Sequence, residues 1–168
     1  MPEVQRNSVH GFTDHEKALI KKTWRVVSNN MPGVGAKIFL KIFSLRPQVK
    51  QIFPCRDVTG EDLLRDTHFR GHASRFMQAV GAAVDNINDL DQAMAPLLFG
   101  LGTQHIHYSG FKPEYFDIFI VAILEVFAEE LGSKYTEGVA TAWRRVVEFI
   151  ISKLKEGYVH ALEKERLD

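Results

Sequence analysis

The stretch HFRGHASRFMQAVGAAV, residues 68–84, has the apolar spacing of a buried helix face and places a histidine on that face. Residues three, four and seven positions apart share one side of a helix, so His72 is predicted to point toward the core. The apolar residues that share this side are Phe69, Ala73, Phe76, Val80, Ala83, Val84 and Ile87. His105 follows Leu98 and Leu101 at the same spacing, so a second helix is predicted to aim an imidazole inward.

Helical periodicity continues along the rest of the chain, and no stretch has the alternation of a strand. The capping-box sequence Thr13-Asp14-His15-Glu16 predicts that the first helix begins after Thr13. Further helices are predicted around 36–43, from after Asp89 to near Ser109, from Pro113 to Gly132 and over 140–158, with a surface loop at 56–62. We therefore predict an all-α domain of six to eight helices at 13–162, between tails at 1–12 and 163–168.

Composition limits the classes of function. The chain of 168 residues is 45% hydrophobic and 25% charged, which suits one globular domain. It has 21 Lys and Arg against 21 Asp and Glu, so no net charge favours nucleic acid or an anionic membrane. The single cysteine, Cys55, cannot form an internal disulfide, and neither a secretory leader nor an apolar run of about 20 residues is evident. We expect a cytoplasmic protein without nucleic-acid or membrane partners.

The two inward histidines have two interpretations. Either one alone is explained by a core imidazole hydrogen-bonded to a carbonyl or hydroxyl, whereas one metal centre between the helices explains both together. His68 and His72 have a spacing that can bind zinc, but the adjacent glutamate of a zinc hydrolase and a third ligand are missing. His107 is predicted at a rim or in solvent. The histidines expected to be solvated are His10, His15 and His160.

The order of several landmarks resembles the globin family over residues 13–162. These landmarks are Trp24, Phe39, Phe53 with Pro54, His72, His105, Pro113 with Phe116, and Trp143. Short segments such as TWRVVS, AAVDNINDL and TAW are more similar to neuroglobin-like sequences and invertebrate globins than to vertebrate myoglobin. The resemblance implies a globin fold that encloses haem b.

The resemblance also implies roles for particular residues. His105 corresponds to the proximal iron ligand, and His72 corresponds to the distal histidine, which either donates a hydrogen bond to a bound gas or coordinates the iron itself. The apolar walls of the haem pocket would be Phe39, Phe53, Phe76, Leu101, Phe111 and Phe116, although core packing explains any one of them equally well. Arg75 corresponds to the pocket edge, near a haem propionate, or is a solvated helix arginine.

The function implied is reversible binding of O₂, with CO and NO as further ligands, for oxygen transport or storage. The alternatives are a redox globin, acting as NO dioxygenase or nitrite reductase with a separate reductase, and a gas or redox sensor with a separate partner. Because no flavin or nucleotide motif accompanies the histidines, we expect a binding protein instead of an enzyme. Phe76 stands where many globins have a smaller residue, and it either holds His72 away from iron or presses it toward iron.

Overall fold

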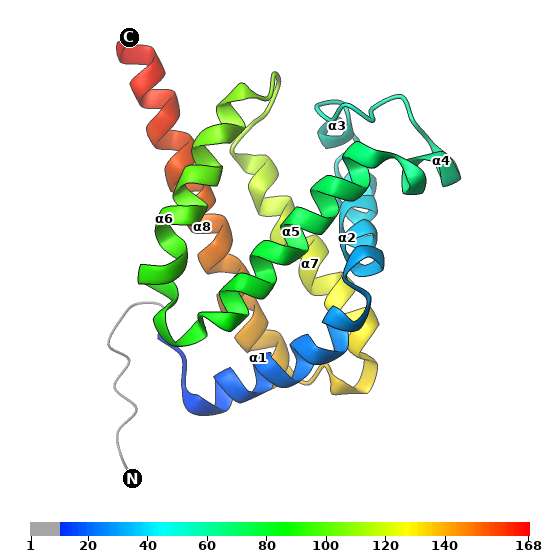
Figure 1. Ribbon diagram of the computed structural model, residues 1–168, viewed down its shortest axis with the longest axis vertical. Helices are drawn as coiled ribbons and strands as arrows, with labels where there is room; N and C mark the ends of the chain where they lie inside the picture. Colours follow the sequence, from blue (N-terminus) through cyan, green and yellow to red (C-terminus); the bar gives the residue numbers. More distant parts are fainter. Residues whose placement is uncertain (1–10) are drawn as a thin grey trace.

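The computed structural model describes residues 11–168, and these residues form helices and no strand (Figure 1). The α-helices are α1 (Asp14–Val27), α2 (Met31–Leu45), α3 (Pro47–Lys50), α4 (Gly60–Arg65), α5 (Thr67–Asp85), α6 (Leu90–Gln104), α7 (Glu114–Leu131) and α8 (Glu137–Leu167). Short 3₁₀ helices lie at Ser28–Asn30, Ile87–Asp89, His105–His107 and Gly132–Lys134. The predicted all-α class is confirmed.

The helices pack around one core. In Figure 1, α5 crosses in front of α7, while α6 and α8 run side by side. Helix α2 packs against both α5 and α7, and α8 packs against α1, α6 and α7. Gly35 allows the close crossing of α2 and α5, since a Cβ there would lie 2.9 Å from the carbonyl oxygen of Ala73. This arrangement places His72 on α5 and His105 at the end of α6 around the same interior space.

Trp143 anchors the centre of the core. Its indole is fully buried and packs edge-on against Phe127, with ring centroids 4.9 Å apart. The indole N–H donates a hydrogen bond of 2.8 Å to the Thr23 hydroxyl of α1. The hydroxyl in turn donates to the carbonyl of Leu19, so the one polar group in this region is fully satisfied. The bond therefore ties α8 to α1 through the core.

The structure corrects four of the predicted boundaries. Helix α4 begins at Gly60, within the predicted loop at 56–62, where Gly60 has a φ of +61° that suits glycine. Helix α6 ends at Gln104, and the chain tightens to a 3₁₀ turn instead of continuing to Ser109. Helix α8 continues to Leu167, beyond the predicted domain end at 162. Phe12, placed in the predicted tail, is buried, whereas residues 1–10 with His10 lie outside the described residues.

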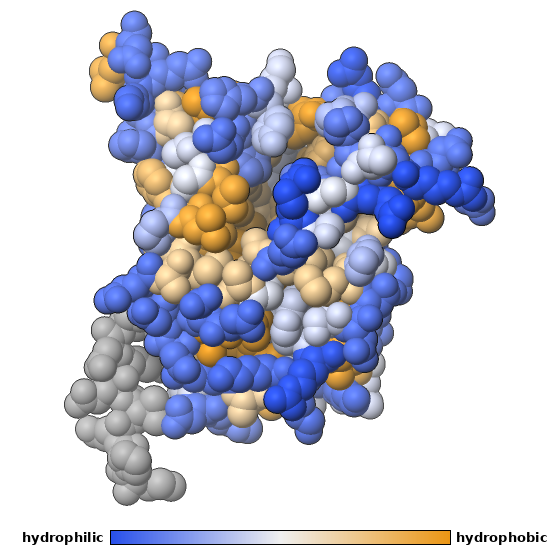
Figure 2. All heavy atoms as spheres, in the orientation of Figure 1, coloured by the Kyte–Doolittle hydropathy of each residue, from blue (hydrophilic) through white to orange (hydrophobic). Residues whose placement is uncertain are grey.

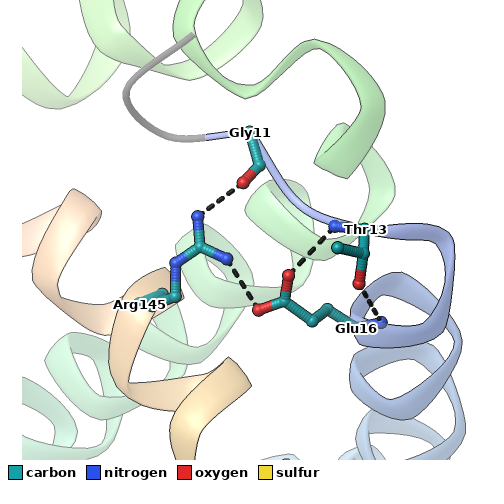
Figure 3. Close-up of polar contacts among 4 residues, drawn as sticks. All are labelled: Gly11, Thr13, Glu16 and Arg145. Carbon is teal, nitrogen blue, oxygen red and sulfur yellow. Dashed lines mark hydrogen bonds and ion pairs between the residues drawn. The ribbon is translucent and has the colours of Figure 1, made fainter. Parts of the chain in front are cut away.

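The predicted capping box at Thr13 is confirmed, and a charged network extends it (Figure 3). The Thr13 N–H donates to the Glu16 carboxylate at 3.0 Å, and the Glu16 N–H donates to the Thr13 hydroxyl at 3.1 Å. Arg145 of α8 donates to Glu16 at 2.6 Å and also to the carbonyl of Gly11. Its guanidinium lies 4.5 Å from the ring centroid of Phe12. One arginine thus attaches the start of the described chain to α8.

We predict that Arg145→Ala lowers the free energy of unfolding by roughly 2 kcal/mol, because hydrogen bonds to a shielded charged group are lost. Urea denaturation at neutral pH measures the difference. Arg144→Ala is the matched control, since Arg144 lies on the same helix and its ion pair with Glu148 is exposed. That pair is expected to contribute about 0–1 kcal/mol. An equal decrease in the free energy of unfolding in Arg145→Ala and Arg144→Ala would contradict the role given to Arg145.

The effect of Arg145→Ala also depends on pH. Burial alone raises the pKa of the Glu16 carboxyl, but hydrogen bonds from Thr13 and Arg145 and the charge of Arg145 outweigh it, so the pKa falls below its ordinary 4.5. A carboxyl whose pKa is lowered by folding stabilises the folded protein at pH values above its pKa in the unfolded chain. This stability is lost as the pH falls through the pKa of the carboxyl in the folded protein. The difference in the free energy of unfolding between wild type and Arg145→Ala should therefore shrink below about pH 4.5. A difference that is constant with pH would argue against this coupling.

Candidate functional site

Two adjoining cavities occupy the space between α5, α6 and α7, and each has a volume of about 190 Å³. Five side chains line both cavities: those of His72, Arg75, His105, Tyr108 and Phe119. The two histidines therefore stand at the boundary between the cavities. Each imidazole faces both spaces at once.

The rest of the cavity lining is mainly apolar. The first cavity is completed by Val49, Ile52, Phe53, Pro54, His68 and Phe111. The second is completed by Phe76, Ala79, Leu98, Leu101, Gln104, Phe116, Ile150, Ile151 and Leu154. Figure 2 shows hydrophobic side chains gathered at the surface over α6, beside a hollow between α6 and α5. Leu101, which lines the second cavity, is 41% exposed. Apolar surface left open in this way suits an apolar ligand.

His105 has a fixed ring orientation. Its Nδ1 lies 2.7 Å from the carbonyl oxygen of Leu101, one turn earlier. A carbonyl can only accept a hydrogen bond, so Nδ1 carries the proton and Nε2 keeps its lone pair. Burial lowers the pKa of His105, while the hydrogen bond to Leu101 partly opposes that shift. The ring is therefore neutral at neutral pH and offers Nε2 to a ligand.

The 3₁₀ turn His105–His107 brings Tyr108 to the site. Side chains three residues apart eclipse one another in a 3₁₀ helix, so Tyr108 follows directly above His105. Their ring centroids are 5.3 Å apart at an interplanar angle of 77°. Phe111 and Phe116 also pack against the imidazole, with centroids 5.2 Å and 5.0 Å away. Three aromatic rings that also line the cavities thus pack around His105.

His72 packs against two aromatic rings. Phe39 and Phe53 pack against its ring at centroid distances of 4.8 Å and 5.0 Å, both in edge-to-face geometry. Within residues 11–168, His72 has no hydrogen-bond partner. Burial lowers the pKa of His72 to about 4, with the nearby positive charges of His105 and Arg75 adding to the shift. At neutral pH the imidazole is uncharged and faces the cavities.

Phe76 packs against Phe39, the ring that contacts His72. Its ring packs edge-on against Phe39, with centroids 5.7 Å apart, and in a tilted geometry against Phe119, with centroids 5.6 Å apart. Phe39 also lies 5.3 Å from Phe119. Phe76 and Phe119 therefore brace Phe39, and Phe39 in turn packs against the imidazole of His72.

The structure brings the predicted site residues together. The residues that line one or both cavities are Phe53, His72, Arg75, Phe76, Leu101, His105, Phe111 and Phe116, and Phe39 packs behind His72. Tyr108 and Phe119 line both cavities but were not among the predicted site residues. Phe119 could have been found, because it follows Phe116 by three residues on the same face of α7. Among the other described histidines, His15, His107 and His160 are exposed as predicted, and His68 is exposed at the edge of the first cavity.

Residues 36–154 match the model of the globin family. The chain belongs to the globin family. Among its relatives, Cytoglobin-2 of Danio rerio is 33% identical over 138 residues, which cover 81% of this chain and 76% of the relative. Neuroglobin of Tetraodon nigroviridis is 26% identical over 149 residues, covering 88% and 92%. A solved structure of a hexacoordinated haem protein from an anhydrobiotic tardigrade has a TM-score of 0.81 at 25% identity and covers 88% of this chain and 95% of its own.

Globins bind haem b, and the site of this globin fits that cofactor. Within residues 11–168, no three His, Cys, Asp or Glu side chains gather as ligands for a bare metal ion. Two neutral imidazoles match the two axial positions that a porphyrin leaves open on its iron. A flat macrocycle around an iron between His72 and His105 would extend to both sides of the pair, where the two cavities lie. None of the helices formed by residues 11–168 is long and apolar enough to cross a membrane.

We predict that His105→Leu sharply reduces haem retention during purification, because the imidazole that faces the cavities from α6 is lost. His107→Ala is the control, since His107 is exposed and lies two residues away. The ratio of Soret to protein absorbance measures the retained haem. Equal retention and an unchanged spectrum in His105→Leu would show that another group holds the haem.

Proposed function

We propose that this globin binds O₂ reversibly, for transport or storage, with His105 as proximal ligand and His72 as a distal ligand that coordinates in the absence of gas. When bound, haem supplies an iron held by four porphyrin nitrogens, at which O₂, CO and NO bind. The chain supplies the axial groups and the walls. The likeness to the hexacoordinated tardigrade protein supports coordination by two histidines.

The observation that carries the proposal is the shared position of the two histidines. Both imidazoles border the same two cavities, and both have lowered pKa values, so each offers an uncharged ring. Imidazole must be neutral to ligate iron. His72 has no hydrogen-bond partner within residues 11–168, which leaves both of its nitrogens available to a group in the cavities. An iron between the two rings satisfies both.

His105 serves as the permanent ligand because its ring is held from behind. The hydrogen bond from Nδ1 to the Leu101 carbonyl fixes the tautomer and raises the basicity of Nε2. The surrounding rings of Phe111, Phe116 and Tyr108 limit rotation of the imidazole. His105 is thus positioned to stay bound while the other axial group exchanges.

His72 serves as the exchangeable ligand because, within residues 11–168, its ring packs against Phe39 and Phe53 without a hydrogen bond such as the one that holds His105. A gas reaches the distal side only when His72 moves away, past Phe39 and Phe53. Once displaced, its N–H can donate a hydrogen bond to the bound gas, with a net value of roughly 1 kcal/mol. The apolar rings around it exclude water, which limits oxidation of the iron.

Arg75 and Tyr108 are proposed to hold the polar edge of the haem. Both are exposed, and both line the two cavities at their opening. The guanidinium of Arg75 is suited to a charge-assisted hydrogen bond with a propionate, and the Tyr108 hydroxyl can donate a neutral one. The remaining apolar walls, from Phe53, Phe76, Leu101, Phe111 and Phe116, then enclose the porphyrin.

We predict that the rate of CO binding to the ferrous protein saturates with CO concentration, because CO must wait for His72 to dissociate. His72→Leu should remove the saturation, and its gas-free spectrum should become five-coordinate and high-spin. Stopped-flow mixing over a range of CO concentrations measures both. A five-coordinate wild type in which His72→Leu also leaves O₂ release unchanged would exclude both roles of His72.

The same apparatus tests the proposed binding function against redox chemistry. Transport or storage requires that O₂ binds and leaves over repeated cycles while the iron stays ferrous. We expect fast reversible binding and slow oxidation, since the distal wall is apolar and His72 can hydrogen-bond the gas. Oxidation within a few binding cycles would contradict the proposal and favour a redox globin.

A further inference from the structure

Helices α6 and α8 touch backbone to backbone at two glycines. Both Gly102 of α6 and Gly157 of α8 are buried. A Cβ on Gly102 would overlap the carbonyl oxygen of Leu154, and a Cβ on Gly157 would overlap the carbonyl oxygen of Phe99. Because each obstacle is backbone held within a helix, no side-chain rotation relieves the overlap. At these two points the helices can pack as they do only without a side chain.

The two contacts form a matched pair. Leu154 and Gly157 lie three residues apart on α8, and Phe99 and Gly102 lie three residues apart on α6. Each glycine faces a carbonyl of the opposite helix at the place where α6 and α8 pack together, and in Figure 1 both helices rise from their N-terminal ends. Contacts of this kind bring Cα–H groups toward carbonyl oxygens, an additional weak attraction. Two fixed points one turn apart prevent α6 from sliding along α8.

The contact at Gly102 lies directly behind the proximal histidine. His105 follows Gly102 by three residues, at the end of the same helical turn. The carbonyl that orients its ring belongs to Leu101, the residue next to Gly102. On α8, the side chain of Leu154 lines the second cavity. Any separation of α6 from α8 at this point moves both His105 and the carbonyl that orients it.

We infer that Gly102 and Gly157 are positioning residues that set where His105 stands relative to the haem iron. This inference rests on the proposed role of His105 as proximal ligand. A Cβ at either glycine forces the end of α6 away from α8, and His105 moves with it. The iron–imidazole bond then lengthens or tilts, although neither glycine contacts the haem site through a side chain.

The test compares Gly102→Ala and Gly157→Ala with Gly100→Ala. Gly100 lies on the same helix with nothing within 4 Å of an added Cβ, so it matches the change in helix propensity without the overlap. All three are placed in the His72→Leu protein, where His105 alone would ligate the ferrous iron. Resonance Raman spectroscopy measures the iron–histidine stretching frequency, and transfer to apomyoglobin measures the rate of haem loss.

We expect a shifted stretching frequency and haem loss faster by about 10-fold or more in the two variants with the overlap, as is common when support for a metal ligand is removed. Gly100→Ala should match its parent in both. A merely structural contact would lower the melting temperature of the variants and leave the frequency unchanged, which would overturn the inference. Loss of helical circular dichroism in both overlap variants would also overturn it, since the contact would then hold the whole fold.

A detached ligand separates the position of His105 from the shape of the pocket. In His105→Gly, free imidazole supplied in solution can ligate the iron without attachment to α6. Adding Gly102→Ala should then leave the iron–imidazole frequency unchanged. A shift that persists with free imidazole would overturn the inference. If His105→Gly keeps the wild-type spectrum without imidazole, the proposed ligand role of His105 itself fails, which is a distinguishable result.

Discussion

Two uncharged imidazoles that face one apolar space impose the main constraint on this molecule. The His72 imidazole is half-buried beside the cavities, and its nitrogens have no hydrogen-bond partner within residues 11–168 but are not sealed from solvent. The surrounding rings do not supply one, because their edges offer only weak contacts. In the proposed function, an iron between His72 and His105 accepts both lone pairs, and the haem that carries it fills the two cavities.

The two sides of the site are built differently, and this difference supports the roles proposed for them. His105 is held by a hydrogen bond to Leu101 and by a helix pinned to α8 through Gly102. His72 is held by the ring edges of Phe39 and Phe53, and such aromatic contacts contribute about 0.5–1.5 kcal/mol each. A stronger restraint favours the permanent ligand, and a weaker one favours the ligand that exchanges with gas.

Helical periodicity predicted much of this site because it acts within one helix. The inward direction of His72 follows from the apolar face of α5, and the family resemblance follows from landmarks in order along the chain. His105 lines both cavities even though α6 ends one residue before it. The effect of Phe76 was left open, since its action through Phe39 depends on packing between α2 and α5.

Other features depend on contacts that a single sequence does not display. Tyr108 enters the site because the chain tightens to a 3₁₀ turn after Gln104, which apolar spacing does not signal. Arg145 binds Glu16 across 129 positions of the chain. The contacts of Gly102 and Gly157 involve backbone atoms of the opposite helix, so the two glycines resemble the exposed Gly100 in sequence. Each of these requires the tertiary arrangement of the helices.

The central claim is that His72 and His105 both coordinate one haem iron. Electron paramagnetic resonance of the ferric protein at neutral pH tests it most directly, because two axial imidazoles make ferric haem low-spin, whereas a water molecule in place of one leaves it high-spin. The account predicts a rhombic low-spin signal that is converted to an axial high-spin signal by His72→Leu. A dominant high-spin signal in the wild-type protein would contradict it.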